Sequence, residues 1–333
     1  MKPAFIVGAP RSGTSWFQQL VGAHPEIVTP PETHLMHMYL HPMLRAWQRQ
    51  VGRMERAIAD LDAGRSVGDR LLGLPSVLTE RQFRDGVLAL IDEVVDQART
   101  SKPEADVFLE KTPSNALSID VTEWFFTEPK YIHLIRHPRD SIASLMRLSR
   151  TSWGYWTPQS VDAATRYWSR YHHGSMRTHE FEGRSLVIRY EDLVDDAAAS
   201  LESTFEFLGV QADRLLCDSI AADLTMERQR DESANSFVFA GELKRMLGER
   251  PFAEPGSHFR ENGSAHALTP RDEWLIDRAL GDIIRELGYA PARNARSGWL
   301  ESAALEVTYR ARSAARRVAG SATQRATAYS ARH

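Results

Sequence analysis

A short polar turn near the start of the chain carries the residues best suited to hold an anion. After an apolar stretch, and before a helical pattern, it contains Arg11, Ser12, Gly13, Thr14 and Ser15. A turn between a strand and a helix points backbone N–H groups at one place, and the helix N-terminus adds partial positive charge. Gly13 permits close approach of the backbone, the hydroxyls add donors, and Arg11 supplies a fixed cation. The pattern predicts a cradle for a phosphate-like group.

The same turn lacks the lysine of a nucleotide-triphosphate P-loop. That signature requires G-x-x-x-x-G-K-[ST], and no lysine stands in this turn. No acidic residue at a predicted strand end is positioned to hold Mg²⁺. We therefore expect an anion that reacts without a metal. Two alternatives to an enzyme of this kind are a P-loop nucleotide kinase or NTPase and a non-catalytic nucleotide-binding module.

Two candidate bases and one candidate cation stand later in the chain. Glu32 and His34 follow a proline pair, which stiffens the backbone that presents them. Lys111 ends an apolar segment and is one of five lysines in a chain with 36 arginines. A carboxylate or an imidazole can accept a proton, and an ammonium can stabilise developing negative charge.

The segment Pro10–Trp16 resembles the 5′-phosphosulfate loop of sulfotransferases that use 3′-phosphoadenosine-5′-phosphosulfate (PAPS). Further segments, in the family's order, span most of residues 4–270. The Pro-Arg-Ser-Gly-Thr loop and the later Glu32 are similar to those of the Golgi-type and tyrosylprotein branch. The resemblance implies sulfuryl transfer from PAPS, without a metal, to a hydroxyl or amine of a small-molecule, sugar or lipid acceptor.

The resemblance also implies a site for the 3′-phosphate of the donor. It places Arg136, at the end of a strand, and Ser144, eight residues later on a helix, against this phosphate. A charge-assisted hydrogen bond of this kind contributes about 1.5–3 kcal/mol. Arg139 and Ser141 are nearby alternatives.

Other segments are assigned to the nucleotide by the same resemblance. A late loop closes the 3′-phosphate site in the family, and the candidates here are Arg260 and Gly263. Tyr190 is expected to border the adenine. Trp16 occupies a position where relatives stack an aromatic ring on the base, and it could equally belong to the core.

The implied mechanism assigns roles to three residues. Relatives that sulfate tyrosine or sugar hydroxyls place a Glu after the loop, and Glu32 follows Arg11 by 21 residues. Glu32 would take the acceptor proton, while Arg11, the loop N–H groups and Lys111 stabilise the leaving group of an in-line transfer. His34 is the alternative base.

The pattern of predicted strands and helices that position these residues indicates an α/β fold with a central parallel sheet. Four apolar segments alternate with helical patterns and are predicted as buried strands: Phe5–Gly8, Val107–Lys111, Tyr131–Arg136 and Leu186–Tyr190. Helices on both sides would make a P-loop-like three-layer fold, whose ligands bind beyond the carboxyl ends of the strands. Further helices are predicted at Asp162–Phe181 and Pro270–Leu287.

One large domain, residues 1–290, is predicted, with an acceptor-side insertion at about 36–104. Within the insertion, Arg45–Arg56 and Glu80–Ala98 are expected to be helices. Residues 291–333 form a basic tail with eight arginines and two glutamates. We expect a dispensable, solvated tail; contact with an anionic membrane surface is the alternative.

The overall composition excludes several classes of protein. The net charge of −3 gives no global field that attracts nucleic acid, and the single cysteine, Cys217, excludes an intramolecular disulfide. No signal-peptide core and no run of 18 apolar residues is found, so we expect a cytoplasmic enzyme. Five aromatic residues suggest an aromatic-lined acceptor pocket: Tyr39, Trp47, Trp153, Tyr155 and Trp156.

Overall fold

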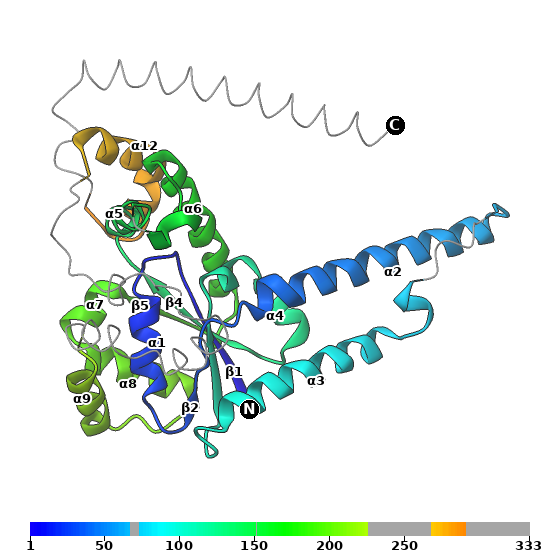
Figure 1. The fold of residues 1–333 in the computed structure, drawn as a ribbon, viewed down its shortest axis with the longest axis horizontal. Helices are drawn as coiled ribbons and strands as arrows, with labels where there is room; N and C mark the ends of the chain where they lie inside the picture. Colours follow the sequence, from blue (N-terminus) through cyan, green and yellow to red (C-terminus); the bar gives the residue numbers. More distant parts are fainter. Residues whose placement is uncertain (67–72, 151, 226–267, 291–333) are drawn as a thin grey trace. The chain divides into compact units, whose positions relative to one another are not determined.

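A five-stranded parallel sheet forms the centre of the molecule. The computed structural model describes residues 1–66, 73–150, 152–225 and 268–290. The strands lie in the order β2-β3-β1-β4-β5 (Figure 1). Their bounds are β1 Lys2–Val7, β2 Ile27–Val28, β3 Val107–Lys111, β4 Lys130–Ile135 and β5 Ser185–Arg189. The four predicted strands are confirmed, and β2 is added because two residues are too short to show a periodicity.

The register of the sheet brings the predicted site residues to one edge. Ile6 of β1 pairs with Lys111 of β3 and with Ile132 of β4, all in parallel. The loop after β1, the end of β3 and the loop after β4 therefore share the carboxyl edge, where ligands of such sheets bind. Arg136 lies just beyond β4, and Tyr190 begins a helix directly after β5 rather than ending the strand as predicted.

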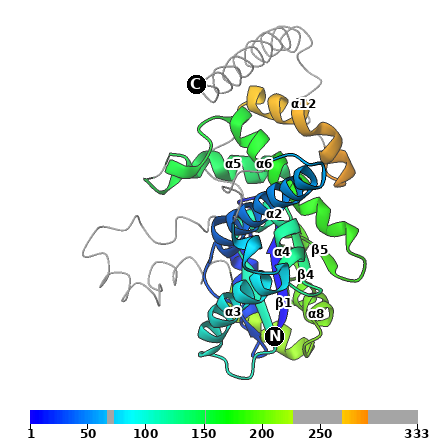
Figure 2. The same cartoon turned by 90° about the vertical axis from the view of Figure 1, so that its right-hand side faces the viewer.

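Alternate residues of β1 pack on opposite faces of the sheet. Ile6 belongs to a core cluster with Phe17 and Leu20 of α1 (Thr14–Gly22). The same cluster includes apolar side chains of α7 (Tyr190–Asp195), α8 (Ala197–Leu208) and α9 (Arg214–Asp223). Phe5 packs instead on Phe126, after α4 (Ile119–Phe125), with ring centroids 5.2 Å apart. Helices on both faces complete the predicted three layers (Figure 2).

The predicted insertion is a pair of long helices that project from the sheet (Figure 1). It comprises the π-helix η1 (Leu35–Leu40), α2 (His41–Asp62), the 3₁₀ turn η3 (Leu74–Ser76) and α3 (Glu80–Arg99). Trp47 and Phe83 stack at 4.4 Å between ring centroids and join the two helices. Trp47 is therefore a packing residue of the insertion, whereas the sequence suggested a pocket aromatic.

The helices after β4 carry the remaining site elements. α5 (Pro138–Leu148) follows β4 and contains Ser144, and α6 (Val161–Met176) follows a 3₁₀ segment, η5 (Ser152–Trp156). Another 3₁₀ segment, η6 (Arg177–Glu180), continues α6, so the long helix predicted to Phe181 changes its winding near its end.

The described residues divide into two compact units, one ending at Ala267 and one beginning at Leu268. The second contains α12 (Pro270–Glu286), which begins with a capping box between Thr269 and Asp272, and confirms the helix predicted there. Among the helices of the described ranges, none is both long enough and apolar enough to cross a membrane. The basic tail, 291–333, lies outside the described residues.

Candidate active site

The loop between β1 and α1 is held in a conformation that requires glycine. Gly13 has φ +92°, and a Cβ there would lie 2.5 Å from Cδ2 of Tyr190. Arg11 also has a positive φ of 71°, which strains a residue with a side chain. The N–H of Ser12 donates to the Ala9 carbonyl at 3.1 Å and closes the turn. The backbone of this loop is thus shaped by its surroundings, as expected of a binding loop.

Side chains that follow β4 and β5, and one from α5, converge on this loop. Nε of Arg11 donates to Oγ of Ser144 at 3.0 Å, and Nη1 of Arg136 donates to the carbonyl of Arg11 at 3.2 Å. The Arg136 guanidinium lies over the Tyr190 ring, 4.2 Å from its centroid. The structure thus brings together four residues that the sequence predicted to bind the nucleotide.

The pKa of Arg11 is lowered by its position among buried groups and other cations. Burial, followed by the positive charges of Arg136 and Arg147, lowers the pKa of Arg11 to about 10. Packing guanidinium groups against each other is unfavourable, and a bound anion would offset that repulsion. The edge of the sheet above β1 and β4 is therefore suited to an anionic ligand.

A second group, beside the loop, joins the predicted base and the predicted cation. Lys111 forms an ion pair with Oε1 of Glu32, and its Nζ donates to Oγ of Ser15 at 3.1 Å. Lys111 is buried, with 3% of its side chain exposed, whereas Glu32 is 37% exposed. Nε2 of His34 lies 3.9 Å from Oε2 of Glu32. An accessible carboxylate next to a buried ammonium is suited to accept a proton from a ligand that arrives from solvent.

Glu110 is a positioning residue that the sequence analysis missed. It is fully buried and accepts hydrogen bonds from Oγ1 of Thr33 at 2.8 Å, from Oγ1 of Thr112 at 2.6 Å and from Nδ2 of Asn115. It therefore ties the turn that carries Glu32 to the end of β3. A charged residue inside an apolar strand was the available signal, because a buried carboxylate requires hydrogen-bond partners.

The two aromatic candidates differ in their surroundings. Trp16 is 7% exposed, and its indole N–H donates to the Leu224 carbonyl at 2.9 Å. Its ring meets Tyr190 edge-on at 6.4 Å. The core role predicted for Trp16 is what the structure shows, and its stacking on a base remains a prediction. Tyr190 forms one wall of the loop, against Gly13 and beneath Arg136.

The remaining nucleotide candidates are partly described. Ser141, one turn before Ser144 on α5, is fully buried, and its hydroxyl has no hydrogen-bond partner among the described residues. Ser141 and Ser144 are three residues apart, which places them on the same face of α5. Ser141 therefore stays an alternative phosphate ligand. Arg260 and Gly263 lie outside the described residues. In the described part of the chain, no group of three or more His, Cys, Asp or Glu side chains could hold a metal.

A family model described as "Sulfotransferase family" matches residues 3–214. The chain belongs to the sulfotransferase family. The match includes the binding loop, the Glu32–Lys111 pair and the Arg136–Ser144 segment, so the resemblance drawn from the loop is confirmed at the level of the family.

Two known proteins illustrate what this chain is similar to. It is 26% identical to protein-tyrosine sulfotransferase 2 of Gallus gallus over 207 residues, which is 62% of this chain and 50% of the relative. It spans about half to two thirds of the length of the curated relatives it matches. Its fold is similar to that of mouse sulfotransferase SULT7A1 complexed with PAP, with a TM-score of 0.53 and 16% identity over 86% of each chain. The predicted fold class is therefore confirmed.

Proposed function

We propose that this sulfotransferase moves a sulfuryl group from PAPS to a hydroxyl or amine of its acceptor, with Glu32 as the general base. The observation that carries the proposal is the contact of Glu32 with Lys111 and, through it, with Ser15 of the anion-binding loop. A proton acceptor and a cation thereby stand directly beside the loop. Sulfuryl transfer needs both groups, because the nucleophile must lose a proton and the leaving oxygen gains charge.

The residues around the loop fit the two charged ends of PAPS. The loop N–H groups, Ser12, Thr14 and Arg11 would hold the 5′-phosphosulfate. Arg136 and Ser144 would hold the 3′-phosphate, and Tyr190 would border the adenine (Arg260, Gly263 and Trp16 are the further candidates). The lowered pKa of Arg11 supports this fit, since burial and then the charges of Arg136 and Arg147 disfavour its cation, and a bound anion would favour it. The SULT7A1 structure was determined with PAP. PAP is adenosine 3′,5′-bisphosphate, the nucleotide that remains after PAPS has transferred its sulfuryl group.

Three side chains would carry the transfer. Glu32 accepts the proton of the acceptor hydroxyl as the oxygen–sulfur bond forms. Lys111 gives up its contact with Glu32 and contacts the oxygen that bridges sulfur and phosphorus in PAPS. The bond between this oxygen and sulfur breaks in line with the attack. Arg11 and the loop N–H groups stabilise the phosphate that departs with the electron pair. His34, 3.9 Å from Glu32, is the alternative base.

The competing functions lack support of this kind. A P-loop kinase or NTPase needs the lysine of the G-x-x-x-x-G-K-[ST] signature, which this loop does not contain. A non-catalytic nucleotide-binding module would have no use for a carboxylate paired with a buried lysine. One assay can distinguish both alternatives from sulfuryl transfer.

The test uses purified protein, a deproteinised metabolite extract and PAPS. We expect mass spectrometry to find products that gain one sulfuryl group, and to find none with the Glu32→Gln variant or without PAPS. ATP with Mg²⁺ replaces PAPS in a parallel reaction. Turnover of ATP alone, or tight PAP binding with no sulfated product from any extract, would overturn the proposal in favour of one of the two alternatives.

A further inference from the structure

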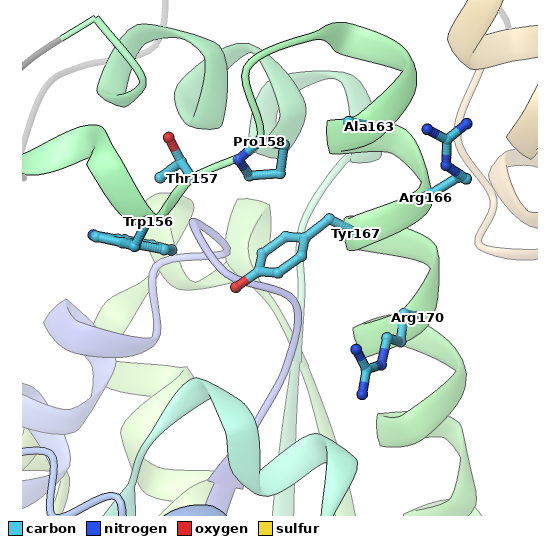
Figure 3. A pocket seen from close by; sticks show the side chains of 7 residues that line it. All are labelled: Trp156, Thr157, Pro158, Ala163, Arg166, Tyr167 and Arg170. Atoms are coloured by element: carbon cyan, nitrogen blue, oxygen red, sulfur yellow. The ribbon is translucent and has the colours of Figure 1, made fainter. Parts of the chain in front are cut away.

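A second cluster of aromatic and cationic side chains lines an open, shallow pocket of about 420 Å³, called the cavity below (Figure 3). It lies between the segment Trp156–Pro158 and one side of α6. None of its lining residues belongs to the loop, the Glu32–Lys111 pair or the Arg136–Ser144 contact described above.

The apolar walls of this cavity are two aromatic rings. Trp156 is 43% exposed, so part of its ring is accessible to a ligand. The Tyr167 hydroxyl donates to the Tyr171 hydroxyl at 3.2 Å, so its ring is held in one orientation. Figure 3 shows the Tyr167 ring directed from α6 toward the Trp156 side of the cavity. A flat or apolar ligand could pack against both rings.

The two arginines of the cavity are not equivalent. Arg166 forms an ion pair with Asp162, at 2.7 Å between Nη1 and Oδ2, and points away from the Tyr167 ring. Arg170, one turn later, extends on the same side of α6 as Tyr167. Within the described ranges, no carboxylate lies within 4 Å of the Arg170 guanidinium. Arg170 is an exposed residue, so its guanidinium is accessible to an anionic group of a ligand.

The cavity and the Glu32–Lys111 pair are linked through α6. α6 packs against η4 (Pro113–Leu117), the turn that follows Lys111, so closely that a Cβ on Gly174 would lie 2.1 Å from the Ala116 carbonyl oxygen. On the other side, burial and then the charges of His41, Arg170 and His34 lower the pKa of His37 in η1. Arg170 is thus within electrostatic range of the segment that follows Glu32.

We propose that this cavity is the acceptor subsite, and that the acceptor carries an anionic group for Arg170 next to a ring that packs on Trp156 and Tyr167. The inference rests on the proposed sulfotransferase function. It narrows the acceptor to hydroxyl compounds with a carboxylate or similar anion, because such an anion gains a charge-assisted contact with Arg170 that a neutral acceptor cannot make.

The experiment compares two probes that differ only in charge, 4-hydroxyphenylacetate and 4-hydroxyphenylacetamide. Calorimetry measures the binding of each to the PAP-saturated protein, and turnover with PAPS is measured separately. We expect about ten-fold tighter binding of the acetate, the effect of one charge-assisted hydrogen bond. Arg170→Gln should remove this preference and Arg166→Gln, the matched control on the same helix, should keep it. Trp156→Ala should weaken both probes equally.

The possible failures of the two proposals are distinct. Equal affinity of the two probes, no binding of either, or a preference that survives Arg170→Gln overturns the acceptor inference, whatever the turnover. Preferential binding of the acetate without any sulfated product from PAPS supports the anionic subsite and counts against the proposed reaction. Equal turnover of both probes with equal affinity supports the reaction and overturns the subsite.

Discussion

Replacing Glu32 with glutamine tests the centre of the proposed mechanism. The amide has the shape of the carboxylate but cannot accept the acceptor proton, so we expect kcat to fall about 10²–10⁴-fold. This corresponds to about 2.7–5.4 kcal/mol of transition-state stabilisation. The substitution also removes the partner of Lys111, which is only 3% exposed. Because Glu32 itself is 37% exposed and Ser15 still accepts from Lys111, we expect the free energy of unfolding to fall by only about 1–2 kcal/mol.

The assay must separate catalysis from binding and folding. PAPS turnover gives kcat, calorimetry gives PAP affinity, and urea unfolding gives stability, for wild type, Glu32→Gln and a control. Glu191→Gln is the control, because Glu191 accepts a hydrogen bond from the His137 N–H at 3.0 Å and has no role in the proposed proton transfer. A Glu32→Gln kcat within ten-fold of wild type would refute Glu32 as the base. If His34→Ala is then inactive, the base is His34.

Three further perturbations follow from the described contacts. PAP should bind about ten- to hundred-fold more tightly than AMP, and Arg136→Ala should abolish the difference by calorimetry; equal affinities for wild type would remove the 3′-phosphate assignment. Gly13→Ala should lose PAP binding, because its Cβ would lie 2.5 Å from the Tyr190 ring at a φ of +92°; retained affinity would show that the loop relaxes freely. Burial lowers the pKa of His172 to about 4, and that of His133 well below its usual value. Since the unfolded chain then binds more protons between pH 6.5 and 4, the free energy of unfolding should fall across that window, by about 3 kcal/mol for His172 alone at pH 4. Urea unfolding of wild type and His172→Gln checks this: the variant should show the shallower slope, and identical slopes would contradict the argument.

Glu110 illustrates what pattern reasoning overlooks. The sequence places it next to Lys111 in an apolar strand, where a charge has no local explanation. Its partner Thr33 stands 77 positions away, and only the fold reveals that the buried carboxylate anchors the turn of Glu32. Trp16 shows the same limit, because its core contacts, including the hydrogen bond to the Leu224 carbonyl 208 positions away, cannot be read from the sequence.

The sequence by itself determined the elements and the family. The strand, turn and helix around Gly13 are contiguous, and the apolar strands are recognisable because backbone alternation and helical periodicity depend on neighbouring residues. The loop composition was enough to predict an anion site and to exclude a lysine-containing P-loop. These properties are local, so a single sequence reports them.

The tertiary structure decided which of these residues meet. Arg11 and Ser144 are 133 positions apart, and Lys111 and Glu32 are 79 apart, yet each pair is in contact. Parallel pairing of β1 with β3 and β4 sets the strand ends at one edge, and this register depends on long-range packing of both faces of the sheet. Proximity between distant segments is a property of that packing, which no periodicity along the chain encodes.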